Sequence, residues 1–178
     1  WSLRAFEVLR GPGSVLYGSD AMGGVLHAVT KDPRKLRERD WGVGGRLSFA
    51  GAYPGLGGSL QGDYRHGDYG GYLGATFDHY GDVIAGGGVV QPLSSYQRAA
   101  VRHKSVVNLA PGYRLTAALF ESNIRNAGRT DRINRGRHRS YDNDDLLAYV
   151  RLDKVGSKWF HRIRINLSYH LTNEVESG

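Results

Sequence analysis

Arginine is the residue type whose spacing suggests the most chemistry in this chain. Six arginines fall within one short stretch, Arg125, Arg129, Arg132, Arg135, Arg137 and Arg139. Guanidinium groups form paired hydrogen bonds with carboxylates and phosphates, so this stretch could attract an anionic ligand. A charged loop that contacts only water is the alternative. Gln91 and Tyr96 lie in a second long connection, which is rich in glycine, and they are further candidates for ligand contact.

Acidic and imidazole side chains offer weaker signals. Asp142, Asp144 and Asp145 could bind calcium or a ligand, but a solvated loop end fits them better. Four histidines lie on expected strands, where they suit an interface or a channel wall better than iron ligation: His79, His103, His161 and His170.

No catalytic motif is present. The chain has no His-Glu-x-x-His, no Gly-x-Ser-x-Gly and no cysteine, which excludes a thiolate nucleophile and a cysteine-ligated metal. The glycine-rich stretch 11–19 lacks the Gly-Lys-Ser/Thr ending of a phosphate-binding loop. We therefore expect no enzymatic activity, no bound metal and no cofactor.

Composition narrows the fold class to all-β. Among 178 residues there are 26 glycines and 11 tyrosines but 5 prolines, which favours short extended segments joined by turns and excludes a helical bundle. No run approaches the roughly 20 apolar residues of a membrane helix. The net charge of +7 could serve nucleic acid, anionic lipid or an acidic ligand.

The chain divides near residue 40. Residues 1–31 alternate turn clusters with short strands, residues 32–40 form a charge-dense linker containing Pro33, and residues 41–178 form strands. The chain starts at Trp1 without a signal sequence, so we expect an internal part of a longer protein.

Seven strands with a two-residue hydrophobic period are predicted beyond Trp41. They lie at 43–53, 60–65, 73–78, 98–109, 114–120, 145–153 and 161–171. In the last strand, Ile163, Ile165, Leu167 and Leu171 share one face. Phe120, Leu147 and Tyr149 break the alternation in their strands. The opposite face carries most of the charge and includes Arg46, Arg65, Arg102, Arg151, Arg162 and Arg164.

The connections differ in length on the two sides of the sheet. Four are short (54–58, 67–71, 110–112 and 155–158) and two are long (81–96 and 125–144). If the first strand begins beside the linker, both long loops lie on the far side. Strands of about 9 to 11 residues with this asymmetry are typical of an outer-membrane barrel. The four apolar residues of the last strand would then face outwards.

Alternation alone also fits a soluble sheet whose apolar face is in a core. Seven strands in sequence leave two open edges, however, and this favours a larger closed sheet of which the chain forms a part.

Residues 6–26, followed by Val29, Thr30 and Lys31, closely resemble the end of the plug domain of TonB-dependent outer-membrane receptors. The family motif residues present are Arg10, Gly11, Pro12, Ser14, Leu16, Tyr17, Gly18, Ser19, Ala21, Gly23 and Gly24. Its glycines permit positive φ or close backbone approach. The chain departs from the motif at Leu26-His27-Ala28, where Ile-Asn-Ile is usual, and the strand pattern survives this change.

The resemblance implies an architecture and a function. Residues 1–31 would end the plug, 32–40 would link it, and 41–178 would form the first strands of a 22-stranded transmembrane barrel. The whole receptor would import a scarce nutrient such as a ferric siderophore, haem or cobalamin across the outer membrane of a Gram-negative bacterium.

The resemblance also implies partners. The TonB complex would act through a segment absent from this sequence, and the barrel would contact outer-membrane lipid and lipopolysaccharide. The arginines at 129–139 could then hold a ferric siderophore or lipopolysaccharide phosphates, and Arg10 could pair with an acidic group on the barrel wall. We expect no nucleic-acid partner and a monomer when full length. Recognition by bacteriocins or phage would be a secondary property.

Two rival functions come from other classes. A soluble basic β-domain that binds nucleic acid or polysaccharide should present arginine and tyrosine on one contiguous face. We expect instead that the arginines and the apolar residues separate onto opposite faces. A hydrolase is the third alternative, and it would require a catalytic site that the sequence does not show.

Overall fold

The computed structural model describes residues 3–11, 23–30, 39–51, 54–128, 139–156 and 159–177. The chain forms two compact units, Trp1–Asp32 and Pro33–Gly178. Within the described ranges, no helix has the length and apolar character needed to cross a membrane.

The smaller unit contains one antiparallel hairpin, with β1 at Leu3–Arg10 and β2 at Gly24–Thr30. Gly11 follows β1 with φ of 99°, a conformation that favours glycine, and its N–H donates to the carbonyl of Gly23 at 3.4 Å. A Cβ atom at Gly24 would lie 2.8 Å from the carbonyl oxygen of Leu9. Both positions use the backbone freedom that glycine provides. Seven motif residues lie outside the described residues: Pro12, Ser14, Leu16, Tyr17, Gly18, Ser19 and Ala21.

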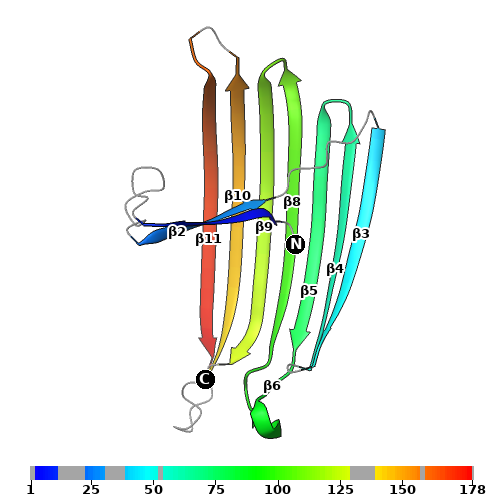
Figure 1. Cartoon of the computed structure of the whole chain (residues 1–178), viewed down its shortest axis with the longest axis vertical. Coiled ribbons are helices and arrows are strands. Elements are labelled where there is room, and N and C mark those ends of the chain that lie inside the picture. The colour runs from blue at the N-terminus through cyan, green and yellow to red at the C-terminus, as the bar shows by residue number, and fades with distance from the viewer. Residues whose placement is uncertain are drawn as a thin grey trace. The chain divides into compact units, whose positions relative to one another are not determined.

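The larger unit is a seven-stranded antiparallel sheet, and the all-β prediction is confirmed. Its strands are β3 (Arg39–Ala50), β4 (Gly55–His66), β5 (Tyr69–Tyr80), β8 (Tyr96–Ala110), β9 (Tyr113–Gly128), β10 (Ser140–Val155) and β11 (Arg162–Ser177). They follow one another as a meander from β3 to β11 (Figure 1).

The strands are longer than the expected 9 to 11 residues. They run from 12 residues in β3 to 16 in β9, β10 and β11. Part of the predicted basic loop is therefore strand, because residues 125–128 belong to β9 and residues 140–144 to β10. Arg39 and Asp40, expected in the linker, belong to β3. Hydrogen bonding to a neighbouring strand extends these segments beyond their apolar alternation.

The connections at the end of the sheet where β3 begins are all short, and both long connections lie at the other end, as predicted. On the end where β3 begins, β4 and β5 are joined through Gly67 and Asp68, and β8 and β9 through Pro111 and Gly112. The other end carries the connection from β5 to β8, residues 81–95, and the connection from β9 to β10. The first of these holds a small hairpin, with β6 at Val83–Ile84, a 3₁₀ turn at Gly86–Gly88 and β7 at Val90–Gln91, near the lower end of Figure 1.

Residues directly opposite each other in neighbouring strands share a face of the sheet. The register therefore assigns faces to all seven strands. On the apolar face, Leu47 lies opposite Gly58 and Gly58 opposite Phe77. Ala117 likewise lies opposite Val150, which lies opposite Leu167. On the polar face, Arg114 lies opposite Asp153 and Asp153 opposite Arg164.

The two faces differ in burial. The buried side chains all belong to the polar face: Ala100, Val106, Ala118, Asp78, Lys104, Thr116 and Asp153. The apolar face is open, with Leu47 at 74% and Leu167 at 75% exposure. Ile163, Ile165 and Leu171 are exposed beside Leu167 and do not pack into a small closed core. The sheet therefore lacks the covered apolar face of a self-contained soluble domain.

The three residues that break the alternation gather on the polar face. Phe120 lies opposite Leu147, and its ring stacks on Tyr149 with centroids 6.3 Å apart. They form a small apolar island beside Lys104 and Ala118, the latter directly opposite Tyr149. The irregularities in sequence are therefore one spatial feature.

We predict that Gly57 and its neighbour Gly58 respond differently to alanine. Gly57 is buried beneath the carboxylate of Asp78, and a Cβ atom there would meet that carboxylate and lie 2.7 Å from Ser48 Oγ. Gly57→Ala should displace Asp78 from Arg98 and lower the free energy of unfolding by about 1–3 kcal/mol. At Gly58, the nearest atom to a Cβ is 3.5 Å away, so Gly58→Ala is the matched control.

Guanidinium titration of the intact protein, followed by tryptophan fluorescence, measures both variants. Equal midpoints for Gly57→Ala and Gly58→Ala would contradict the assignment of the Asp78 carboxylate to this crowded position.

Candidate functional site

An inclined line of aromatic side chains borders the apolar face at the end where β3 begins. Trp41 lies opposite Tyr64, Tyr69 opposite Val107, and Tyr113 opposite Lys154. From β3 to β9, this line shifts by about one residue per strand toward the end of the sheet where β3 begins, compared with residues that are paired directly across the strands. A step of about 3.3 Å per strand spacing of about 4.8 Å corresponds to a tilt of about 35°. Transmembrane barrel strands tilt by about 35–45°.

The apolar face has a nearly constant width along the strands. On β3 it extends from Trp41 to Phe49 and on β11 from Ile163 to Leu171, about nine residues in each case, whereas on β9 it ends at Leu119, before Glu121. Beyond this apolar band, the same side of the sheet is polar, with His79, Gln97, Asn123, Asp144 and Asn173. Tilted strands need about 9–11 residues to cross a bilayer. The apolar band therefore has the width of a membrane.

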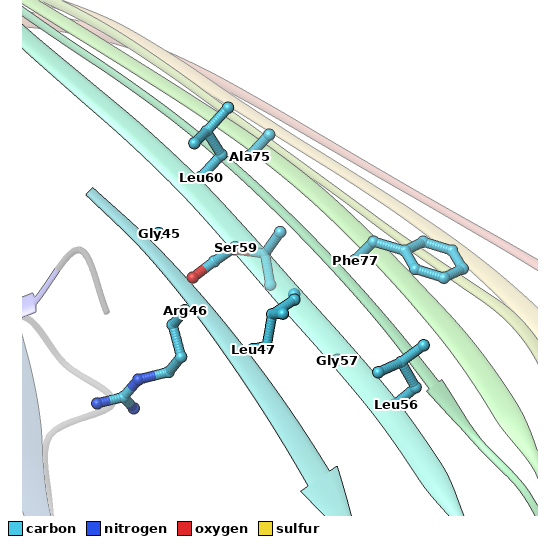
Figure 2. Close-up of a pocket in the computed structure, with 11 residues that line it drawn as sticks. Gly45, Arg46, Leu47, Leu56, Gly57, Ser59, Leu60, Ala75 and Phe77 are labelled. Atoms are coloured by element: carbon cyan, nitrogen blue, oxygen red, sulfur yellow. The ribbon is translucent and has the colours of Figure 1, made fainter. Parts of the chain in front are cut away.

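A hollow of about 870 Å³ lies on the apolar band over β3, β4 and β5. Figure 2 shows Leu47, Leu56 and Phe77 on one side of the sheet and the guanidinium of Arg46 on the other. The small residues Gly45 and Gly58 form part of its lining. This hollow faces away from the charged side chains, so it is unsuited to an anionic ligand.

The polar face holds a charged group near the linker end, which we name the Asp153 cluster: Asp153, Arg151, Arg162 and Arg164. Arg164 Nε donates to Asp153 Oδ1 at 2.8 Å, Arg151 Nε lies 3.0 Å from Oδ2, and Arg162 Nε lies 3.7 Å from Oδ1. Asp153 is 3% exposed. One carboxylate cannot neutralise three guanidinium groups, so this part of the wall keeps a positive charge. The sequence alternation placed Asp153 and these arginines on the same kind of polar face but gave no indication that one carboxylate joins three arginines.

A second ion pair stands nearer the loop end of the same face. Arg98 donates from Nε and Nη2 to Asp78 Oδ2, at 3.1 and 2.5 Å. The Asp78 side chain is 8% exposed. The rings of Tyr80 and Tyr96 contact each other 5.0 Å apart between centroids. Tyr96, a predicted contact residue, therefore lies on the charged wall where β8 begins.

The segment 81–95 is held by its own hydrogen bonds. The N–H groups of Ser94 and Ser95 both donate to Asp82 Oδ1 at 2.9 Å. Ser94 Oγ accepts from Val83 N–H at 2.8 Å and donates to the carbonyl of Gln91 at 2.7 Å. Gln91, the other predicted contact residue, is exposed in β7. The loop therefore presents Gln91 on an ordered hairpin.

The extended ends of β9, β10 and β11 are tied by ion pairs beyond the apolar band. Asp144 Oδ1 accepts hydrogen bonds from Asn123 Nδ2 at 2.6 Å and from Arg125 Nη2 at 2.5 Å. These hydrogen bonds, first from Asn123 and then from Arg125, lower the pKa of the Asp144 carboxyl below its usual value. Asp142 accepts from Asn126 N–H at 2.8 Å. Asp145 lies on the opposite face, and the described residues contain no cluster suited to a metal ion.

Of the five arginines predicted to contact a ligand, Arg139 is the one that the structure describes. Its guanidinium pairs with Glu176 at 2.5 Å, and it lines a hollow of about 340 Å³ together with Leu93, Ser95 and Gly128. Gln91 and Tyr96 do not line this hollow. Arg129, Arg132, Arg135 and Arg137 lie outside the described residues.

The structure does not bring the four predicted strand histidines together. His79 and His103 lie on the side of the apolar face, His170 lies on the polar face 3.6 Å from Asp145, and His161 precedes β11. Arg10 is exposed at the end of β1, and its pairing with a barrel acid stays a prediction.

The expected separation of arginine from apolar residues holds for aliphatic side chains but not for tyrosine. Tyr72, Tyr80, Tyr96 and Tyr149 share the polar face with the arginines. An arginine and tyrosine face of this kind was expected of the nucleic-acid alternative. The open apolar face of the same sheet still argues against a soluble domain, because its leucines would contact water.

Sequence comparisons give no match among protein-family models or curated proteins. The fold is similar to that of a solved structure titled "The FrpB iron transporter from Neisseria meningitidis (F3-3 variant)", with a TM-score of 0.82 and 16% identity. The similarity covers 97% of this chain and 29% of that chain. The chain therefore has the fold of part of that transporter, and its sheet does not close into a barrel by itself.

We predict that removing the charge of Asp153 destabilises the protein strongly. Asp153→Asn leaves three guanidinium groups without their shared carboxylate and should cost about 3 kcal/mol or more. Asp145→Asn is the control, because the Asp145 side chain is 46% exposed, accepts a hydrogen bond from Thr172 and lies 3.6 Å from His170. Its effect should stay below about 1 kcal/mol.

Denaturant midpoints of the full-length protein in detergent measure both changes. A midpoint for Asp153→Asn equal to that of Asp145→Asn would show that the Asp153 cluster contributes nothing to stability.

Proposed function

We propose that this chain is part of a TonB-dependent outer-membrane transporter. In this proposal, residues 1–31 end the plug, residues 32–40 link it to the barrel, and residues 41–178 form the first barrel strands. The cell is a Gram-negative bacterium, and the cargo is an iron chelate. The plug-like motif of the smaller unit and the fold shared with an iron transporter support this proposal independently.

The observation that carries the proposal is the register of the larger sheet. It places the aliphatic side chains of seven strands on one face, over a band about nine residues wide. A bilayer accepts this surface because each backbone hydrogen bond is made between strands. A soluble protein would have to cover it.

The charge of the opposite face favours an anionic cargo. Basic side chains there outnumber acidic ones. The basic residues are Arg46, Arg65, Arg98, Arg102, Lys104, Arg114, Arg151, Arg162 and Arg164, and the acidic residues are Asp63, Asp78, Asp145, Asp153 and Glu174. A wall with this excess attracts anions. Ferric siderophores with exposed carboxylates fit this charge better than neutral chelates do.

Transport of this kind breaks no bond in the cargo. The wall positions an anion and the plug blocks free diffusion, so the energy must come from outside the barrel, through the TonB complex. The arginines at 129–139 would supply the first electrostatic attraction at the external mouth, and lipopolysaccharide phosphates are the other anions they could hold.

We predict opposite environments for the adjacent positions Leu167 and Ser168. The chain has no cysteine, so Leu167→Cys and Ser168→Cys can each carry a single spin label in the full-length protein, provided that the remainder is also cysteine-free. In membranes, the label at 167 should collide more often with oxygen than with a water-soluble nickel complex. The label at 168 should show the reverse. Low accessibility to both reagents at 167 would indicate a soluble core instead.

We also predict that disrupting the gene abolishes most uptake of one radiolabelled anionic iron chelate. The full-length gene should restore uptake, and a protonophore or loss of TonB should stop it without reducing the amount of protein in the outer membrane. Unchanged uptake of every iron chelate tested would contradict the proposed cargo. Uptake that survives loss of TonB would contradict the mechanism.

A further inference from the structure

Three polar side chains interrupt the apolar band on β5 and β8. Tyr69 OH lies 3.2 Å from Ser105 Oγ, and Ser105 Oγ lies 2.9 Å from His103 Nε2. We name these residues the hydroxyl–imidazole triad. All three occupy the same face as Leu73 and Val107, which lie opposite His103 and Tyr69. Polar groups that face hydrocarbon are costly, so their presence needs a partner or a function.

The triad runs from the aromatic border at Tyr69 into the band. On β8 the aromatic line passes close to Val107, which lies directly opposite Tyr69. Ser105 and His103 lie two and four residues beyond Val107, which at about 3.3 Å per residue and the tilt derived above is roughly 5 and 11 Å in depth. Phospholipid ester groups lie near this boundary of the hydrocarbon.

The triad has one more donor than its own acceptors use. The tyrosine hydroxyl, the serine hydroxyl and a neutral imidazole each carry one hydrogen, and three hydrogens serve two internal contacts. Whichever way the chain of hydrogen bonds runs, one N–H or O–H is left over within the described part of the chain. If the two bonds run in the same direction, that donor is the Tyr69 hydroxyl or an imidazole N–H of His103, and if both end residues donate to Ser105 it is the serine hydroxyl. An acceptor supplied from the membrane would satisfy it.

A cleft of about 340 Å³ lies beside these donors. Trp41, Tyr64 and Tyr69 contribute aromatic side chains to its lining, and Leu73 and His103 line it as well. The glycines at 62 and 71 leave it room, and the ring of Tyr69 lies against Gly71. Trp and Tyr side chains are enriched at membrane interfaces because one end is apolar and the other polar. The cleft is therefore open to lipid, at interface depth and next to an unused donor.

We propose that this cleft binds one glycerophospholipid of the periplasmic leaflet, with an ester carbonyl accepting the spare hydrogen bond of the triad. The assignment of the leaflet rests on the proposed function, which puts the linker end at the periplasm. The acyl chain follows the cleft between β3 and β5, against Val43 and Leu73. An ester carbonyl supplies the neutral acceptor that the triad lacks. The aromatic walls exclude water from this hydrogen bond, which strengthens it.

The test compares two lipids that differ only in this acceptor. Full-length protein extracted from outer membranes is delipidated and titrated with diester or diether phosphatidylethanolamine, and bound lipid is counted by native mass spectrometry. We expect the diester to bind about fivefold more tightly, the contribution of one hydrogen bond. Equal binding of both lipids would overturn the inference.

Two variants assign any preference to the triad. The double variant Tyr69→Phe with His103→Phe removes both cleft-lining donors and should abolish the preference for the diester. The matched control, Tyr169→Phe/His79→Phe, changes a tyrosine and a histidine on the same side of the sheet, away from the cleft, and should preserve it. Loss of the preference in both variants, or in neither, would contradict the site.

A third variant tests the cleft without changing a polar group. A Cβ atom at Gly62 would meet nothing closer than 3.8 Å, so Gly62→Leu can fill the cleft without straining the backbone. Binding of both lipids should fall, whereas Gly45→Leu, on the same face outside this cleft, should leave the preference for the diester intact. Failure of the unmodified full-length protein to reach the outer membrane would contradict the proposed function, whereas an unmodified, membrane-inserted protein without ester preference would contradict only the lipid site.

Discussion

Cross-strand backbone hydrogen bonding is the constraint on which the other features of this protein depend. Once the register is fixed, each side chain is committed to one face, and a slip by one residue would exchange the faces of a whole strand. The register from β3 to β11 carries the faces through seven strands with few irregularities, at Asn108 and between Tyr141 and Asn143. A surface for hydrocarbon and a charged wall are therefore two results of the same pairing.

The charged wall is stabilised by unequal pairing. Asp153 and Asp78 are buried with arginines, and a buried carboxylate without such partners would be expensive to ionise. The arginines are only partly buried and keep donors available. Acidic groups on this face therefore hold the arginines in position, while the surplus positive charge remains available to an anion. The apolar island of Phe120, Leu147 and Tyr149 adds a contact surface without charge in the same wall.

The apolar band follows the opposite logic, because there a polar group is the exception. Outside the band, ion pairs such as that of Arg125 with Asp144 lie in water and have modest energetic importance. In the proposed membrane setting, the hydroxyl–imidazole triad inside the band lacks water as an alternative partner, so a single unmet donor matters more. The same side chains would have little significance on the polar face. Depth in the sheet, rather than residue type, gives them their role.

The sequence by itself determined the class of fold and the number of strands, because a two-residue period and turn-forming residues are local properties of the chain. It also determined that Arg151, Arg162 and Arg164 share a face, and it placed both long connections at one end. The strand ends were less accessible, since residues 125–128 and 140–144 are held in strands by their neighbours and not by their own pattern.

Only the tertiary structure decided which residues meet across strands. Asp153 joins three arginines, Phe120 reaches Tyr149, and Ser105 links Tyr69 to His103 because the hairpin register brings distant positions within contact. Alternation tells which face a side chain occupies but not its height along the neighbouring strand. That height depends on turn lengths and bulges summed over several hairpins, and a local sequence pattern does not contain this sum.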